Sequence, residues 1–288
     1  MPGDEIWPAP EDERHPVDPV VRARIMDTLA RVERDHDVRI LFACESGSRG
    51  WGFASPDSDY DVRFLYAGRL DEYLRVSARR DVIELPVDAT YDVSGWDLRK
   101  ALRLLGRGNA TLFEWLHSPI RYRADEQFVA ELVAAAETAH RPDRTYHHYL
   151  HMARKHLRSV VGVEQVKFKR YFYTLRPLLA ASWIQQHGTR APMVFEDLVD
   201  RQVTDPVVLA AIRELLQRKR RAGEAEVTAP VQVIEDFLVR TVAEVEAAAP
   251  HRSLIDVAPL DGLLAGTLRR LDDAGRPGGG EDPDDQLE

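Results

Sequence analysis

The chain has 288 residues, 44% of them hydrophobic and 30% charged, which is typical of a soluble globular protein with a buried core. Its formal net charge of −9 argues against non-specific coating of nucleic acid, although residues 150–176 are rich in Lys, Arg and His. The single cysteine, Cys44, excludes an internal disulfide. Together with the absence of a membrane-length apolar run or a signal-peptide pattern, it predicts a cytoplasmic protein without membrane association.

The first half of the chain is predicted to mix helices with strands. After a loose lead-in over residues 1–18, apolar residues at helical spacing predict a helix over residues 19–35, which should pack behind the first strand. We expect Ser94 to be the N-cap of a helix over residues 96–105. The other predicted elements are strands over residues 39–44, 60–66, 82–85 and 89–93, short helical segments over residues 47–52, 70–76 and 111–117, and an extended segment over residues 118–123.

The second half of the chain is predicted to be almost entirely helical. A boundary near Pro142 divides the sequence into a mixed domain over residues 19–142 and a helical domain over residues 143–271. Residues 272–288 are rich in Gly, Pro, Asp and Glu and predict a disordered acidic tail. Long apolar periodicity predicts helices over residues 126–139, 145–162, 164–187, 205–222 and 229–248.

The residues that indicate chemistry lie in the segment ILFACESGSRGWGFASPDSDYDVRF, residues 40–64. Alternation along a strand puts the carboxylates of Asp59 and Asp61 on one face, where they repel each other unless a cation lies between them. Hard divalent ions such as Mg²⁺ take such oxygen ligands and keep positions open for phosphate oxygens. Gly47 and Ser48 can present bare backbone N–H groups to an anionic phosphate. This combination predicts metal-assisted phosphoryl or nucleotidyl transfer.

The spacing within this segment resembles a known superfamily. A Gly-Ser pair, a gap of ten residues and Asp-x-Asp on a strand form the pattern of the DNA polymerase β-like nucleotidyltransferases. GSRGWGFASPDSDYDVRF, followed by GWDLRKAL and KRYFYTLRPLLA, is similar to one branch, the RNA repair pathway DNA polymerase β family of predicted nucleotidyltransferases. The resemblance extends over about residues 40–198. It implies an α+β nucleotidyltransferase domain, with a mixed sheet and flanking helices, followed by an all-helical C-terminal domain.

The resemblance also implies two divalent ions, Mg²⁺ or Mn²⁺, held by three carboxylates. Asp59 and Asp61 would be the first two catalytic metal ligands. The third must reach the same face from a neighbouring strand. We expect Asp92 in this position, with Glu84 and Asp88 as alternatives.

Candidate nucleotide-binding residues surround the aspartates. We assign the triphosphate to Gly47 and Ser48, because serine adds a hydroxyl donor to the backbone N–H groups. Arg49 either contacts the same phosphates or is an exposed arginine on a solvated turn. Arg63 alternates with Asp61 along the strand, so it either binds phosphate beside the site or bridges to the Asp61 carboxylate.

A second group of candidates comes from the helical half. In two-domain enzymes of the resembled superfamily, helices of the second domain close over the nucleotide. On that resemblance, Lys169, Tyr173 and Arg176, which form a stripe at helical spacing, are candidate nucleotide contacts. The alternative is a solvated basic face with Tyr173 half-buried.

Two other groups of residues have an ordinary structural explanation beside the functional one. Trp51, Phe53 and Tyr60 could stack on a base, but aromatic residues beside a strand are more often part of a core. His147 and His151 have the spacing of two metal ligands on a helix, but no third ligand is evident.

The predicted function is transfer of a nucleoside monophosphate from an NTP to a hydroxyl acceptor, with release of pyrophosphate. The resemblance suggests an RNA end as the acceptor and a functional association with an RNA ligase, while a small molecule or a protein hydroxyl are alternatives. The rival prediction is a non-catalytic nucleotide sensor or antitoxin-like module. Such a module would keep the Gly-Ser turn and Asp-x-Asp but lack a working third carboxylate.

Overall fold

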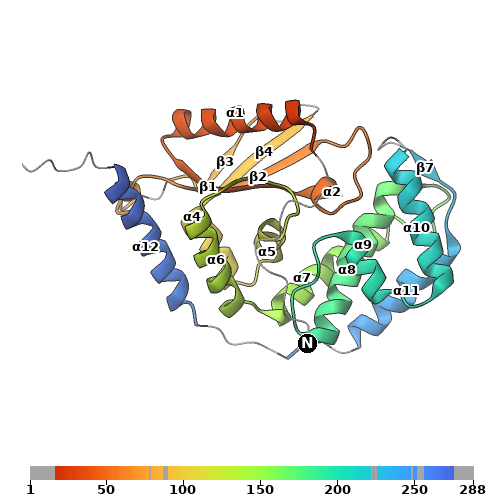
Figure 1. Ribbon diagram of the computed structural model, residues 1–288. Coiled ribbons are helices and arrows are strands. Elements are labelled where there is room, and N and C mark those ends of the chain that lie inside the picture. Colours follow the sequence, from red (N-terminus) through yellow and green to blue (C-terminus); the bar gives the residue numbers. More distant parts are fainter. Residues whose placement is uncertain are drawn as a thin grey trace, which may run out of the picture.

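The protein consists of a part built on a β-sheet and a part built of helices, which lie side by side (Figure 1). The expected α+β class, with a mixed sheet and flanking helices followed by a largely helical region, is confirmed. No helix in the described part of the chain is long and apolar enough to cross a membrane. The computed structural model describes residues 17–77, 79–86, 90–221, 223, 226–247, 249–251 and 256–275.

The elements of the first part follow the predicted order closely. They are α1 (Pro19–His36), β1 (Arg39–Glu45), α2 (Gly47–Gly50), β2 (Tyr60–Ala67), α3 (Leu70–Tyr73), β3 (Val82–Glu84), β4 (Tyr91–Asp97), α4 (Leu98–Gly106), α5 (Ala110–Leu116), β5 (Arg121–Ala124) and α6 (Glu126–Thr138). The predicted lead-in up to residue 16 lies outside the described residues.

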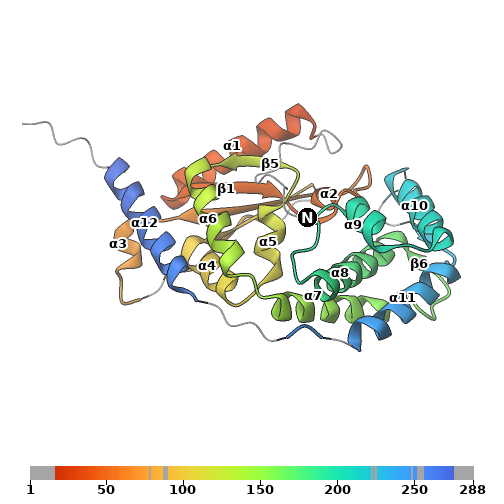
Figure 2. The same cartoon turned by 60° about the horizontal axis from the view of Figure 1, so that its bottom comes forward.

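Five strands form the central sheet in the order β3-β4-β2-β1-β5. The β2–β4 pair is parallel, and the other neighbouring strands are antiparallel. As expected, α1 packs behind the first strand, with Ile25 and Leu29 in one cluster with Ile40 and Ala43. Helices α4, α5 and α6 cover the opposite face of the sheet, which Figure 2 brings to the front.

The prediction that a helix begins at residue 96 with Ser94 as its N-cap is wrong. Ser94 and Trp96 lie within β4, where Ser94 pairs with Arg63 of β2 and Trp96 with Leu65. The backbone groups of these residues are committed to the sheet, so the helix starts only after the strand ends. Asp97 is the actual N-cap of α4, and its carboxylate accepts a 2.8 Å hydrogen bond from the backbone N–H of Arg99.

The second part is helical apart from one short strand pair. Its elements are α7 (Pro142–Leu157), β6 (Val166–Lys167), α8 (Phe168–His187), α9 (Phe195–Gln202), α10 (Pro206–Arg221), β7 (Val227–Thr228) and α11 (Gln232–Glu246). Helix α8 begins later than predicted because β6 pairs with β7, and it continues through Pro177 to a left-handed Gly188 cap. Neither α9 nor the β6–β7 pair was predicted from the sequence.

The last helix returns to the first part of the molecule. Residues 143–271 were expected to form one helical domain, yet α12 (Ala258–Gly275) packs against α4 and α6. Leu260, Leu263 and Leu268 join the apolar cluster beneath the sheet. This helix also continues beyond the predicted boundary at Leu271, because its apolar face packs against the apolar cluster of the sheet domain. Residues 276–288 of the predicted tail lie outside the described residues.

Candidate active site

Two parallel strands bring the predicted carboxylates together. Asp61 on β2 and Asp92 on β4 are direct partners in the strand register. Neighbouring strands lie about 4.8 Å apart, so the two side chains leave the sheet next to each other. Glu84, an alternative for this position, lies on β3, is exposed and forms an ion pair with Arg80. Asp88, the other alternative, lies outside the described residues.

A guanidinium lies between the two carboxylates. The Arg63 Nη2 atom donates to Asp61 Oδ1 at 2.8 Å and to Asp92 Oδ2 at 2.7 Å. Its Nη1 atom donates to the backbone oxygens of Asp92 at 2.8 Å and Val62 at 3.1 Å. Of the two roles considered for Arg63, the structure therefore shows the carboxylate bridge, and this bridge includes Asp92 as well as Asp61. The single positive charge offsets the repulsion between the two carboxylates.

The glycine-serine turn packs directly on Asp61. Gly47 has a φ of +57°, and a Cβ atom at this position would lie 1.9 Å from Asp61 Oδ2. Glycine is therefore needed for both the backbone conformation and the space. The backbone N–H of Ser46 donates to the Asp61 carbonyl at 2.8 Å, and Ser48 is buried. The turn and the carboxylate pair thus form one continuous site.

The carboxylate pair fits a divalent cation in its chemistry, because two hard oxygen donors already converge on one positive group. Asp59, which was predicted with Asp61 as one of the first two ligands, is exposed and lies one residue before β2. No three His, Cys, Asp or Glu residues of the described chain come close enough together to hold a metal ion. The structure therefore assembles Asp61 and Asp92 but does not bring Asp59 into a three-ligand cluster with them. His147 and His151 likewise gain no third ligand among the described residues.

A buried carboxylate that the sequence analysis missed supports Asp61 from below. Glu45, the last residue of β1, accepts the Asp61 backbone N–H at 2.8 Å and the Tyr122 hydroxyl at 2.6 Å. Burial raises the pKa of Glu45 to about 8, against the two hydrogen bonds, which lower it. The neighbouring thiol of Cys44 is fully buried, and burial raises its pKa. Cys44 is therefore a core residue.

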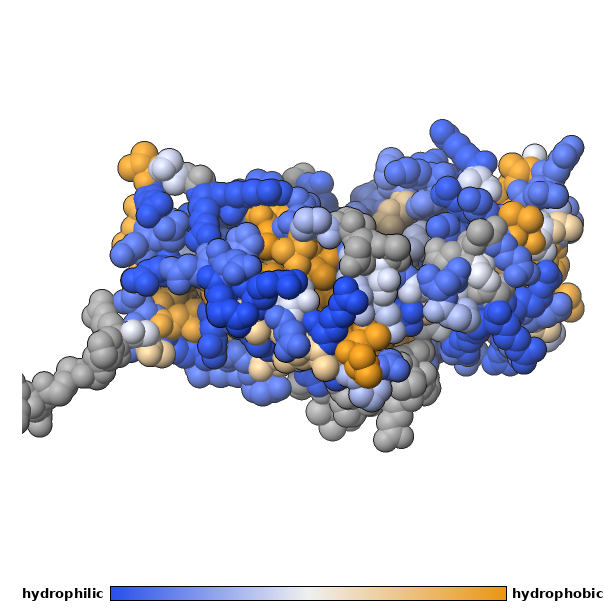
Figure 3. Space-filling model, turned by 90° about the horizontal axis from the view of Figure 1, so that it is seen from above, coloured by the Kyte–Doolittle hydropathy of each residue, from blue (hydrophilic) through white to orange (hydrophobic). Residues whose placement is uncertain are grey.

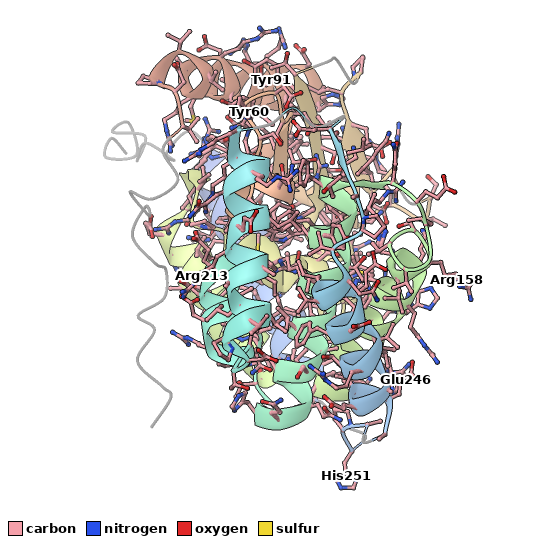
Figure 4. The ribbon with its side chains drawn as sticks, turned by 90° about the vertical axis from the view of Figure 1, so that its right-hand side faces the viewer. Tyr60, Tyr91, Arg158, Arg213, Glu246 and His251 are labelled. Carbon is pink, nitrogen blue, oxygen red and sulfur yellow. The ribbon has the colours of Figure 1, made fainter. Side chains whose placement is uncertain are left out.

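Arg49 holds the loop that leads from the turn to the aspartates. Its side chain donates to the backbone oxygen of Ser58 at 2.6 Å and of Asp59 at 3.1 Å, and its guanidinium lies 3.9 Å from the centre of the Tyr60 ring. The Tyr60 ring in turn stacks on Tyr91, with ring centres 5.8 Å apart (Figure 4). Arg49 was expected either to contact phosphates or to be exposed on a solvated turn. The contacts observed instead hold the loop in position.

The predicted stripe on α8 meets the first part at the Trp51 side chain. The Tyr173 ring packs edge-on against the Trp51 ring, with centres 5.6 Å apart. Arg176 is 3% exposed and donates to Glu114 Oε1 of α5 at 2.7 Å, with its guanidinium 4.7 Å from the Trp51 ring. The same Glu114 oxygen accepts the Tyr149 hydroxyl at 2.6 Å. Arg176 therefore connects α8 to α5, whereas the nucleotide contact predicted for it would require an accessible side chain.

Helix α10 holds the loop between α2 and β2 from the helical part. The buried Lys219 Nζ atom donates to Ser55 Oγ at 2.8 Å, and Arg220 donates to the Gly52 carbonyl at 2.7 Å. Phe53 is fully buried and stacks on Phe172 of α8, so it is a core residue. Seen from above, the outline of the molecule dips between the two parts (Figure 3).

Sequence similarity connects the chain with known proteins. Residues 21–266 match the family described as RlaP, RNA repair pathway DNA polymerase beta family. The chain belongs to this family. It is 42% identical over 229 residues to the uncharacterized protein YcgL of Bacillus subtilis (strain 168), which covers 80% of this chain and 88% of that protein. A nucleotidyltransferase-like protein of known structure from Exiguobacterium sibiricum 255-15 is 10% identical, with a TM-score of 0.31 over 85% of this chain and 80% of the other.

Membership of the RlaP family confirms the resemblance predicted from the motif segments. The structure brings together Gly47, Asp61, Arg63 and Asp92 around one point of the sheet. The residues that sequence reasoning missed in this RlaP protein are supporting groups, namely Glu45, Ser55, Glu114, Tyr122, Lys219 and Arg220. A carboxylate at the end of an otherwise apolar strand was the signal that could have identified Glu45.

Proposed function

We propose that this RlaP-family protein is a metal-dependent nucleotidyltransferase that transfers a nucleoside monophosphate from an NTP to a hydroxyl acceptor and releases pyrophosphate. One observation carries the proposal: the in-register pair Asp61 and Asp92 lies directly against the Gly47 turn. A phosphate-binding backbone and a cation-binding carboxylate pair are thereby adjacent, as an enzyme acting on a metal-bound triphosphate requires.

The carboxylates would hold Mg²⁺ or Mn²⁺, with Asp59 joining Asp61 and Asp92 as the third ligand. When bound, the ion would neutralise charge on the triphosphate and lower the cost of in-line displacement. Gly47 and Ser48 would bind the phosphates through N–H groups and the serine hydroxyl, since the first N–H groups of a helical turn have no acceptor within it. From α8, Lys169 and Tyr173 are the remaining candidates for contact with the nucleotide.

The proposed transfer accounts for each bond that forms and each bond that breaks. The acceptor oxygen forms a bond to the α-phosphorus, the bond from the α-phosphorus to the bridging oxygen breaks, and pyrophosphate leaves. The acceptor hydroxyl gives its proton to a carboxylate of the pair. Asp92 is the better candidate, because its side chain is 33% exposed and that of Asp61 is 19% exposed. Arg63 acts as a positioning residue that fixes both carboxylates through its two nitrogen atoms.

The acceptor we propose is the hydroxyl of a polynucleotide end, which agrees with the RNA repair pathway in the family description. An RNA ligase would then be a functional partner, because it acts on the same ends. Small-molecule and protein hydroxyls are the competing acceptors, since related folds serve several acceptor classes.

One observation favours a second candidate, a non-catalytic nucleotide sensor. Arg63 already neutralises part of the charge of Asp61 and Asp92, and no third carboxylate joins them among the described residues. A protein of this kind would bind the triphosphate on the turn without turning it over.

The two candidates are separated by incubating the protein with each α-³²P-labelled NTP, Mg²⁺ or Mn²⁺, and a mixed RNA pool. The nucleotidyltransferase proposal is supported if label is transferred to RNA and if Asp61→Asn abolishes this transfer. The exposed control Asp200→Asn should retain it. Calorimetric binding of an NTP without transfer to any acceptor class would support the sensor and reject catalysis.

A further inference from the structure

A cluster of basic side chains lies where α7 ends and α8 begins. Residues 150–176 contain seven Lys or Arg residues and one acidic residue, Glu164, in a chain whose net charge is −9. Lys155 and Arg170 are exposed, and His156 lies between exposed and buried. We name Lys155, His156 and Arg170 the His156 cluster.

The cations of the His156 cluster lack the carboxylate partners that other arginines of the helical part have. Arg154 pairs with Glu246 at 2.6 Å, and Arg213 pairs with Asp200 at 2.8 Å. Within the described ranges, no carboxylate lies within ion-pair distance of Lys155 or Arg170. Like charges without partners repel each other, so this arrangement costs stability that a bound anion would restore.

The position of each charge strengthens this argument. Burial, followed by the charges of Arg170 and Lys155, lowers the pKa of His156, so the local potential is positive and the imidazole is held towards its neutral form. Arg170 lies in the first turn of α8, where positive charge opposes the helix dipole and no acidic residue compensates. A neutral ring beside two cations is therefore available for stacking.

The cluster is connected to the candidate active site through two ring contacts. The His156 ring lies 6.0 Å from the Tyr173 ring, centre to centre, and Tyr173 lies 5.6 Å from Trp51. Trp51 directly follows the turn that packs on Asp61. The side of the helical part that carries Arg158, at the end of α7, is opposite the side that carries Arg213 on α10 (Figure 4).

We infer that the His156 cluster binds a single-stranded polynucleotide, with Lys155 and Arg170 on successive phosphates and His156 against a base. Cations that track a backbone beside an aromatic platform are how proteins hold single strands with little sequence preference. The inference rests on the proposed function in naming this strand as the acceptor. Binding at the cluster places the strand beside Tyr173 and Trp51, on the path to Asp61.

The test measures, by fluorescence anisotropy, the affinity of the full chain for a short fluorescein-labelled single-stranded RNA. The measurement is made in EDTA and without NTP, at KCl concentrations between about 50 and about 200 mM. Lys155→Gln with Arg170→Gln should weaken binding about tenfold or more and reduce the slope of log affinity against log salt by about 1.4, because two phosphate contacts are lost. His156→Ala should weaken binding about fivefold or more at unchanged slope, because stacking is lost and no charge is removed.

The matched control removes two charges from other helices of the helical part, α10 and α11. Arg213→Gln with Arg240→Gln changes the net charge equally, and both arginines are exposed and paired with carboxylates. This control should leave RNA affinity and salt slope unchanged. The Lys155→Gln and Arg170→Gln protein should melt at the same temperature as the unaltered protein or higher, since repulsion is relieved.

Four outcomes overturn the inference, and the first three concern RNA binding. These three are absence of RNA binding by the unaltered protein, an equal loss in the control variant, and equal competition by polyglutamate, which would indicate an acidic protein segment as the ligand. A loss of calorimetric NTP affinity in the Lys155→Gln and Arg170→Gln protein would assign the cluster to the nucleotide and also reject the inference. Continued transfer to a different acceptor would leave the proposed function standing.

Discussion

Two arginine–carboxylate clusters, one at the sheet and one at the junction with the helical part, differ in charge balance and exposure. At the sheet, Arg63 faces Asp61 and Asp92, which leaves an excess negative charge, and these side chains are 17–33% exposed. At the junction with the helical part, Arg176 faces Glu114 alone, with side chains 3% and 13% exposed. Excess charge near solvent attracts another cation, whereas a balanced buried pair holds elements together. The comparison predicts that the first cluster serves binding and the second serves the fold.

The largest effect is expected at the sheet cluster. Asp61→Asn keeps the shape of the side chain but removes a charge that a metal needs, so transfer of label from α-³²P-NTP should fall by about 10³-fold. The melting temperature should change little, because the amide can still accept from Arg63. Activity within tenfold of the unaltered protein would contradict the assignment of Asp61.

The junction cluster should show the opposite response. Arg176→Met leaves Glu114, whose side chain is only 13% exposed, without its counter-ion. This change should lower the free energy of unfolding by about 3–5 kcal/mol in urea titrations. Adding Glu114→Gln to Arg176→Met should recover part of this loss, because the unpaired charge is gone. If the single variant were fully stable but inactive, Arg176 would belong to the binding site instead.

Two histidines next to the junction predict how its stability depends on pH. Burial, followed by the charge of Arg190, lowers the pKa of both His117 and His140 from 6.5 to about 4. Between these values the unfolded chain binds more protons than the folded one. Their contribution is therefore complete above about pH 6.5 and is lost as the pH falls towards 4, by about 1–3 kcal/mol per histidine. In urea titrations, the free energy of unfolding should fall less between pH 7 and pH 5 in the His117→Asn, His140→Asn double variant than in the unaltered protein. An equal fall in both proteins would show that these histidines do not cause the pH dependence.

Substitution of two glycines distinguishes the effect of backbone strain from the effect of a change at the candidate phosphate site. Gly47 and Gly188 have φ values of +57° and +67°, but only Gly47 has a neighbour, Asp61 Oδ2, where a Cβ atom would lie. Gly188→Ala should cost about 1–2 kcal/mol of stability through the backbone conformation alone, and Gly47→Ala should cost more because Asp61 must also shift. Only Gly47→Ala should also reduce calorimetric NTP affinity. Equal NTP affinity in the two variants would argue against the turn as the phosphate site.

The smallest expected effect concerns the cation already at the sheet cluster. Arg63→Gln leaves Asp61 and Asp92 to repel each other, and should lower the stability of the metal-free protein by about 1 kcal/mol. Mg²⁺ should then raise the melting temperature of this variant more than that of the unaltered protein. An equal Mg²⁺ response in both proteins would show that the carboxylate pair does not bind the ion.

The sequence by itself determined the mixed class of the first part, the order of its strands along the chain and the family. These features depend on local patterns, such as strand alternation around Asp61 and the glycine-serine spacing. It also limited the expected partner carboxylate of Asp61 to a neighbouring strand, where Asp92 lies. It did not determine where the helix after β4 begins, because Ser94 is a good N-cap in isolation but is used in the sheet ladder.

Tertiary structure alone decided which charges face each other. Arg63 and Arg176 look alike in the sequence, and only packing gives Arg63 two carboxylates that are 19% and 33% exposed and Arg176 a single carboxylate that is 13% exposed. The same applies to Lys219, which reaches Ser55 across 164 positions of the chain, and to α12, which returns to cover the sheet domain. Contacts between distant segments depend on how whole faces of helices and sheets pack together, and a local pattern of residues does not determine that packing.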